Sequence, residues 1–300
     1  MRPGSRVALV APASPFDRAE FERGVTELRR LGLDPVFDEG LFARDGFVAG
    51  TAAHRAAALR QAWSPDIDAI IAVRGGYGSV HVLPFLSADE IRASRTMFIG
   101  YSDVTSIHIY LGSHVGMASL HGPMIDGRLA RGPEAYDPVS LLAGLAAEPI
   151  GELAPAGVEV LRHGEARGPL FGGTLTQILA SLATPYAFAP PAGHILFLDE
   201  VGERPYRLDR MLTQLRLSGL LARASAVVFG QMPRCDEPGG AVTARETVRA
   251  ALDGFSGPVL FGFPSGHTVT PMLTLGLGVE TRVVTSGQPR VVVLEAVARD

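Results

Sequence analysis

The sequence predicts an α/β protein with an N-terminal doubly wound parallel-sheet domain, residues 1–150, and a β-rich mixed C-terminal domain, residues 151–300. In the first half, short apolar runs alternate with helical patterns, as in a parallel sheet covered by helices. In the second half, the apolar runs are more widely spaced and richer in glycine. The chain has 300 residues, of which 47% are hydrophobic and 19% charged, so it can bury a core large enough for two domains.

The first half contains strand and helix signals in alternation. Asp17 and Glu20 form an N-terminal capping pair, Phe21, Val25 and Leu28 share one helix face, and Gly32 provides the stop. Thr51 caps the second helix. We predict strands over 7–10, 36–37, 69–73 and 97–99, and helices over 17–31 and 52–63.

The second half begins after a stretch rich in Pro and Gly, residues 128–157, which we interpret as a connection between domains with one helix over 139–147. Leu208, Met211, Leu212 and Leu215 follow helical spacing, and Gly219 ends that helix. We predict strands over 195–198, 226–229, 259–261, 274–279 and 290–294.

Composition excludes several classes of function. The net charge is −4 without a basic block, so we expect no nucleic-acid partner. No run approaches the ~20 apolar residues of a membrane span, and the N-terminal run 7–12 is too short for a signal peptide, so we expect a cytoplasmic protein without a membrane partner. Cys235 is the single cysteine, in what is predicted to be a surface loop. No metal-ligand spacing occurs, and we expect no metal and no cofactor.

Ser102 follows the apolar strand 97–99 at a predicted tight turn, and a helix begins near Thr105. A serine at a sharp strand-to-helix turn is exposed, and the first N–H groups of the helix lie beside it. This geometry suits a nucleophilic hydroxyl. The alternative is an ordinary serine N-cap.

A glycine-rich loop, residues 74–79, follows the strand over 69–73. Glycines such as Gly75 and Gly76 let the backbone approach a ligand and direct N–H groups at an anion. The spacing matches no dinucleotide or phosphate motif, so an oxyanion-binding loop fits better, with a plain turn as the alternative. Arg74 is either a ligand for a substrate carboxylate or half of a structural ion pair.

Asp199, Glu200 and His267 also follow apolar strands. A serine nucleophile needs a base, and the base needs an acid that holds its tautomer. The order of serine, acid and histidine is that of the α/β-hydrolases, although the second glycine of their motif is absent. His121 is the competing candidate for the base.

These motifs together resemble the LD-carboxypeptidases (muramoyltetrapeptide carboxypeptidases) and the related microcin-C immunity peptidases. The resemblance runs nearly from end to end. It covers Ala11-Pro12-Ala13-Ser14, Val73-Arg74-Gly75-Gly76-Tyr77-Gly78, Ile99-Gly100-Tyr101-Ser102-Asp103-Val104-Thr105, His121-Gly122-Pro123-Met124, Phe171-Gly172-Gly173-Thr174-Leu175, Leu198-Asp199-Glu200-Val201-Gly202-Glu203, Tyr206-Arg207-Leu208-Asp209-Arg210-Met211-Leu212 and Gly262-Phe263-Pro264-Ser265-Gly266-His267.

The resemblance implies an active site between the two domains, with Ser102 as nucleophile, His267 as base, and the amides of Gly76 and Asp103 as oxyanion donors. It implies a small peptide substrate, murein tetrapeptide, from which terminal D-alanine is removed. It also implies a metal-free, cytoplasmic enzyme, often a homodimer. The family acid is usually Glu, whereas Asp199 stands at that position here, with Glu200 as the alternative.

Thr174 stands where relatives commonly have Asn, which concerns a hydrogen bond in the substrate pocket. Two other functions remain open at this stage. One is a microcin-type immunity peptidase that hydrolyses a peptidyl- or aminoacyl-nucleotide. The other is a non-catalytic Rossmann-like binding module that holds a ligand at Gly75 and Gly76.

Overall fold

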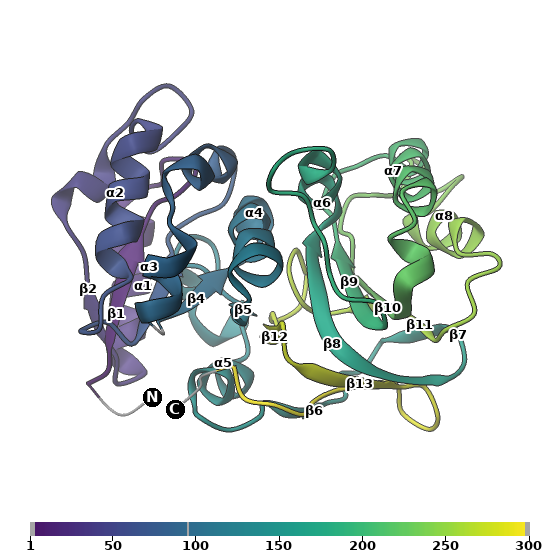
Figure 1. Ribbon diagram of the computed structural model, residues 1–300. Coiled ribbons are helices and arrows are strands. Elements are labelled where there is room, and N and C mark those ends of the chain that lie inside the picture. Colours follow the sequence, from purple (N-terminus) through teal and green to yellow (C-terminus); the bar gives the residue numbers. More distant parts are fainter. Residues whose placement is uncertain (1–3, 95, 298–300) are drawn as a thin grey trace.

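The structure is a computed structural model that describes residues 4–94 and 96–297, and these residues form two sheets that lie side by side (Figure 1). The first sheet contains, in spatial order, β12 (Leu275–Leu277), β5 (Ser119–His121), β4 (Met97–Gly100), β3 (Ala69–Ala72), β1 (Arg6–Val10) and β2 (Asp34–Val36). All its neighbouring pairs are parallel except β12 with β5. The predicted parallel sheet of the N-terminal half is confirmed.

The second sheet is mixed, as predicted. It contains, in spatial order, β6 (Gly151–Leu153), β14 (Arg290–Val293), β13 (Glu280–Val284), β8 (Glu165–Thr174), β9 (His194–Asp199), β10 (Ala224–Gly230), β11 (Val259–Phe263) and β7 (Glu159–Arg162). The central strands β8 to β11 run parallel, and the outer strands pair antiparallel. The carboxyl ends of the parallel strands therefore meet at one edge.

Helices cover both sheets, with α1, α2 and α3 on the first and α6, α7 and α8 beside the second (Figure 1). The helices are α1 (Arg18–Arg30), α2 (Ala52–Ala62), α3 (Ala88–Ser94), α4 (Thr105–Ile109), α5 (Pro138–Leu145), α6 (Leu175–Ser181), α7 (Pro205–Leu217) and α8 (Ala244–Ala251). The predicted N-caps of α1 and α2 are confirmed: the Asp17 and Thr51 side chains accept from the third helical amide. The reciprocal half of the Asp17–Glu20 pair is not formed, because the Glu20 carboxylate pairs with Arg23 instead. None of the helices in the described part of the chain is long and apolar enough to cross a membrane.

Strand β8 was not predicted from the sequence, and neither were β5, β6, β7 and β13. β8 contains Gly168, Pro169, Gly172 and Gly173, residues with low strand propensity. Pairing with β9 on one side and β13 on the other decides its conformation. Its last residue, Thr174, is thereby placed in register with Asp199.

The stretch 128–157 is not a simple connection. It contains α5 and β6, and Leu129 and Tyr136 are fully buried. The sheets do change near residue 150, where β6 begins the second sheet, but β12 from the C-terminal half returns to the first. The domain boundary at residue 150 stays a prediction.

Cys235 does lie outside the helices and strands, but its predicted surface position is wrong. Its side chain is buried in the same core cluster as Phe229 and Met232. Burial raises the pKa of the Cys235 thiol to about 11, so it is held as a neutral thiol, and a thiolate nucleophile at this position is disfavoured.

Candidate active site

Ser102 lies two residues after the end of β4, in a turn where its own backbone is left-handed, φ +66°. A non-glycine residue in that region costs about 1–2 kcal/mol, so the turn is strained. A short 3₁₀ segment, Ser102–Val104, leads into α4, and the Ser102 side chain is partly exposed while its neighbours are buried. The structure therefore presents this hydroxyl at the carboxyl end of a central parallel strand.

His267 reaches Ser102 from the other half of the chain. It lies in the loop after β11, and its Nε2 is 3.0 Å from Ser102 Oγ. Its Nδ1 is 2.6 Å from Asp199 Oδ2, and Asp199 ends β9. The three side chains form a continuous hydrogen-bonded chain, so the structure brings together the serine, acid and histidine singled out from the sequence.

Asp199 is fully buried and has several donors. Besides the His267 ring, its carboxylate accepts from the His267 backbone amide at 2.8 Å and from the Thr174 hydroxyl at 2.8 Å. Burial by itself would raise the pKa of Asp199, but the nearby His267 and its hydrogen bonds outweigh burial and bring the pKa to about 2. An ionised Asp199 accepts from Nδ1–H, which leaves the lone pair of Nε2 directed at Ser102.

The Glu200 carboxylate is held at the start of α6 and by the Val201 amide, whereas Asp199 is the acid that contacts His267. Its carboxylate accepts from the Thr176 amide at 2.9 Å, the Thr176 hydroxyl at 2.7 Å and the Val201 amide at 3.0 Å. Burial raises the pKa of Glu200, and these hydrogen bonds oppose the rise. Successive side chains of an extended segment point to opposite sides, so the two neighbouring acids serve different elements.

The glycine loop packs against Ser102. A Cβ placed on Gly75 would lie 2.9 Å from Ser102 Cβ and 3.3 Å from the Asp103 amide nitrogen, so only glycine fits. The loop is fixed by Ser14, whose amide donates to the Gly75 carbonyl at 3.1 Å and whose hydroxyl accepts from the Tyr77 amide at 3.0 Å. Gly76, between them, has φ +91° and is exposed.

Asp103 accepts hydrogen bonds from both halves of the chain. Its carboxylate accepts from the Ser79 amide at 2.8 Å and from Gln177 Nε2, on α6, at 3.2 Å. The Ser79 hydroxyl donates to the Asp103 carbonyl at 2.7 Å. These contacts fix the peptide groups directly after Ser102, where the sequence predicts an oxyanion donor.

Arg74 and Thr174, the candidate substrate ligands, both have partners within the protein. Arg74 pairs with Asp126 at 3.5 Å and donates to the Pro15 carbonyl at 3.2 Å, which is the structural ion pair left open above. Thr174 is buried, and its hydroxyl is occupied by Asp199. In the structure the Thr174 hydroxyl therefore helps to hold the Asp199 carboxylate.

His121, the competing candidate for the base, is fully buried. Its Nδ1 is 3.1 Å from Ser265 Oγ, and that hydroxyl also donates to the Leu273 carbonyl at 2.9 Å. Burial lowers the pKa of His121 to about 4. The nearby His108 donates from Nε2 to the Gly100 carbonyl at 2.9 Å, and burial lowers its pKa to about 3. Both are neutral structural histidines at pH 7.

Several residues that support the site have no clear signal in the sequence. Ser14 lies in the motif after β1, and Gln177 and Arg128 have no local signal at all. Thr105, the last residue of the serine motif, accepts from the Thr174 amide at 3.1 Å and so joins the two halves. A polar residue at the carboxyl end of a parallel strand is the signal that would have pointed to Ser14.

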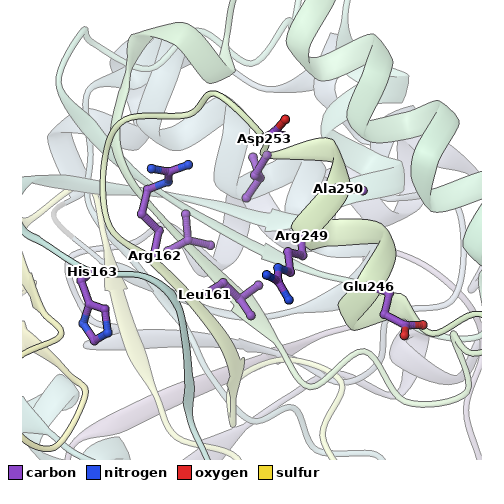
Figure 2. Close-up of a pocket in the computed structure, with 9 residues that line it drawn as sticks. Leu161, Arg162, His163, Glu246, Arg249, Ala250 and Asp253 are labelled. Carbon is purple, nitrogen blue, oxygen red and sulfur yellow. The ribbon is translucent and has the colours of Figure 1, made fainter.

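A cavity of about 670 Å³ lies elsewhere, between the end of β7 and α8 (Figure 2). None of the sequence-predicted site residues lines it; its lining includes the basic residues Arg162 and Arg249, the acidic residues Glu246 and Asp253, and Leu161. Among the described residues, no group of three or more His, Cys, Asp or Glu side chains is arranged to hold a metal ion.

Comparison with known families gives a match in each half. Residues 7–122 match the model of the LD-carboxypeptidase N-terminal domain, and residues 167–283 match that of the LD-carboxypeptidase C-terminal domain. The first region ends after β5 and contains Ser102. The second contains Asp199 and His267.

Individual relatives cover most of the chain. A putative carboxypeptidase of Streptomyces coelicolor is 37% identical, covering 89% of this chain and 86% of its own length. The murein tetrapeptide carboxypeptidase of Pseudomonas aeruginosa is 32% identical, covering 87% of this chain and 88% of its own length. The microcin C7 self-immunity protein MccF of Escherichia coli is 27% identical, covering 91% of this chain and 88% of its own length. The crystal structure of muramoyltetrapeptide carboxypeptidase from Oxalobacter formigenes superposes with a TM-score of 0.86 at 25% identity, covering 97% of this chain and 99% of that one.

Proposed function

The chain belongs to the LD-carboxypeptidase family, and from that premise we propose that it is a serine carboxypeptidase that releases terminal D-alanine from murein tetrapeptide. The observation that carries the proposal is the chain of hydrogen bonds from Ser102 Oγ through the His267 ring to Asp199, 3.0 Å and 2.6 Å long. The name of the 32% identical relative from Pseudomonas aeruginosa supports the choice of substrate.

In the proposed reaction, Ser102 Oγ attacks the carbonyl carbon of the scissile L,D-peptide bond while its proton passes to His267 Nε2. The amides of Gly76 and Asp103 bind the oxyanion; loss of one such donor costs about 10²–10³ in rate. His267 then protonates the D-alanine amine as the C–N bond breaks. Water, deprotonated by His267, hydrolyses the acyl-enzyme and restores Ser102.

Asp199 has two roles in this proposal. Its negative charge stabilises the imidazolium of His267, and its hydrogen bond to Nδ1 keeps the ring in the tautomer that accepts from Ser102. Asp is one methylene shorter than the Glu usual in the family. The close approach of the loop, where the His267 amide lies 2.8 Å from Asp199 Oδ2, compensates for that difference.

The test is to incubate the protein with purified murein tetrapeptide and to measure free D-alanine, with Ser102→Ala as control. We expect release by the wild-type protein, none by the variant, and no effect of a metal chelator. Release that survives Ser102→Ala would refute the serine mechanism. An unchanged ligand affinity with no turnover in either protein would favour the binding module.

A second candidate substrate is a peptidyl- or aminoacyl-nucleotide amide, because the 27% identical relative is a microcin immunity protein. The same triad would serve it, since the difference lies in the pocket. Hydrolysis of an aminoacyl-sulfamoyl nucleotide without release of D-alanine from murein tetrapeptide would identify this alternative.

We also propose that the enzyme acts in the cytoplasm as a homodimer. Sedimentation of the purified protein tests the oligomeric state, and fractionation of the source cells tests the location.

A further inference from the structure

Arg128 is a buried arginine in the stretch between β5 and α5, and it touches both halves of the site. Its side chain donates to the Tyr101 hydroxyl at 3.3 Å, the Ala135 carbonyl at 3.1 Å, and the carbonyls of Gly266 and Thr268, each at 3.1 Å. Tyr101 precedes the nucleophile, and Gly266 and Thr268 flank the base. One guanidinium therefore holds the backbone on both sides of His267.

The peptide group between Gly266 and His267 is held from both ends. Its carbonyl accepts from Arg128, and its N–H donates to Asp199 Oδ2 at 2.8 Å. A hydrogen-bonded chain from a cation through a peptide group to a carboxylate is cooperative, because each bond polarises the next. These two hydrogen bonds also fix the orientation of the peptide group that precedes the His267 side chain.

No carboxylate of the described residues lies within ion-pair distance of Arg128, and only 8% of the residue is exposed. A buried cation is costly unless polar groups surround it. Here the compensation comes from carbonyl oxygens and the Tyr101 hydroxyl, with the buried Asp199 one peptide group away.

Tyr101 extends the same contacts to the ring of the base. The Arg128 guanidinium lies 5.7 Å from the centre of the Tyr101 ring, and that ring meets the His267 imidazole edge-on, with centroids 5.2 Å apart. The backbone and the imidazole of His267 are thus both bounded by groups that Arg128 holds.

We propose that Arg128 is a positioning residue for catalysis, which holds His267 in line between Asp199 and Ser102 through the Gly266–His267 peptide and Tyr101. This inference rests on the proposed serine mechanism, but not on the identity of the substrate. Lysine cannot replace arginine, because one ammonium group cannot reach the two loop carbonyls and the tyrosine in the same fixed geometry.

The test compares Arg128→Lys and Arg128→Met with the wild-type protein at a temperature where each is folded. We expect kcat for D-alanine release to fall about 10²-fold, because a misplacement of about 1 Å has that effect, while KM changes little. The rate at which an alkyl fluorophosphonate labels Ser102 should fall in parallel. The downfield Nδ1 proton signal of His267, assigned by its loss in His267→Ala, should shift or broaden in both variants.

Arg55 provides a matched control. It is also buried and donates to three carbonyls, those of Gly50 at 3.0 Å, Pro12 at 2.5 Å and Gly78 at 2.7 Å. Arg55→Lys should lower thermal stability and leave the His267 proton signal unchanged, since these hydrogen bonds hold segments of the N-terminal half and not the loop that carries His267.

Three outcomes would overturn the inference. The first is a kcat and a labelling rate within about twofold of wild type. The second is a lower kcat with an unchanged His267 proton signal, and the third is loss of folding in both Arg128 variants while Arg55→Lys stays folded. If the wild-type protein releases no D-alanine but the fluorophosphonate labels Ser102, the proposed substrate is wrong, and labelling and proton signal still decide the role of Arg128.

Discussion

The two halves of the molecule build their parts of the site by different means. The N-terminal half presents Ser102 through local geometry: a strand, one strained residue at φ +66° and the start of α4. The C-terminal half contributes Asp199, the last residue of β9, and His267, which lies 68 positions later in the loop after β11. Ser102 is presented by a strained turn, whereas Asp199 and His267 are held by buried hydrogen bonds.

The difference predicts different sensitivities. A strained turn is stable only because the surrounding sheet fixes it, so replacing Ser102 should change activity far more than folding. A buried carboxylate with several donors is part of the core, so replacing Asp199 should change both.

The largest expected effect comes from removing either partner of the Ser102–His267 hydrogen bond, which joins the two halves. Ser102→Ala and His267→Ala should each lower kcat by about 10⁶, and the double variant should be no slower, because the residues act as a unit. Steady-state D-alanine release measures this. If the two effects multiply, the residues act independently and the proposed mechanism is wrong.

The next effect separates the two neighbouring acids. Asp199→Asn should lower kcat by about 10⁴, because the amide disfavours the tautomer that His267 needs. Glu200→Gln should leave kcat near wild type and lower the free energy of unfolding by about 1–2 kcal/mol, since an NH₂ group then faces the backbone N–H of Thr176 or of Val201. The reverse pattern would assign the acid role to Glu200.

Acidification should lower the free energy of unfolding in two pH ranges, a higher one set by histidines of the N-terminal half and a lower one set by Asp199 of the C-terminal half. His108 and His121 have folded pKa values of about 3 and 4, below 6.5, so the unfolded chain binds more protons as the pH falls from 6.5. Stability should decrease from pH 6.5 to about 4, by about 1.4 kcal/mol per pH unit for each proton taken up. Denaturant unfolding at pH 7, 5.5 and 4.5 measures the slope, and His108→Gln should make it shallower.

Asp199 acts in a lower range. Its folded pKa of about 2 lies below the ordinary 3.8, so its contribution, about 2 kcal/mol, is present above pH 4 and is lost as the pH falls through 2. Asp199→Asn should remove this part of the pH dependence and keep the part due to the histidines. If Asp199→Asn also abolished the pH dependence of stability between pH 6.5 and 4, the assignment of that range to His108 and His121 would be wrong.

The smallest effect isolates the strain at the nucleophile. Ser102→Gly should be more stable than Ser102→Ala by about 1 kcal/mol, because glycine adopts a positive φ without steric cost. Thermal unfolding of the two inactive variants measures the difference. Equal stabilities would show that the turn stores no strain.

Local sequence determined much of the fold. The apolar runs of β1, β3 and β4 and the caps at Asp17 and Thr51 lie where periodicity and capping rules predict them. β8, with its glycines and proline, was missed because only its neighbours hold it extended. The stretch 128–157 resembled a linker because Pro and Gly interrupt it, although Arg128, Leu129 and Tyr136 within it are buried.

By itself, the sequence determined which residues stand at the ends of the strands, because hydrophobic runs and turn residues are local signals. It thereby selected Ser102, His267 and two candidate acids. Only the tertiary structure decided that Asp199 faces His267 while Glu200 binds the start of α6, and that Thr174 and Arg128 lie behind them. These contacts join segments that are far apart in the chain, and side-chain direction at a strand end depends on the neighbours that pack against it.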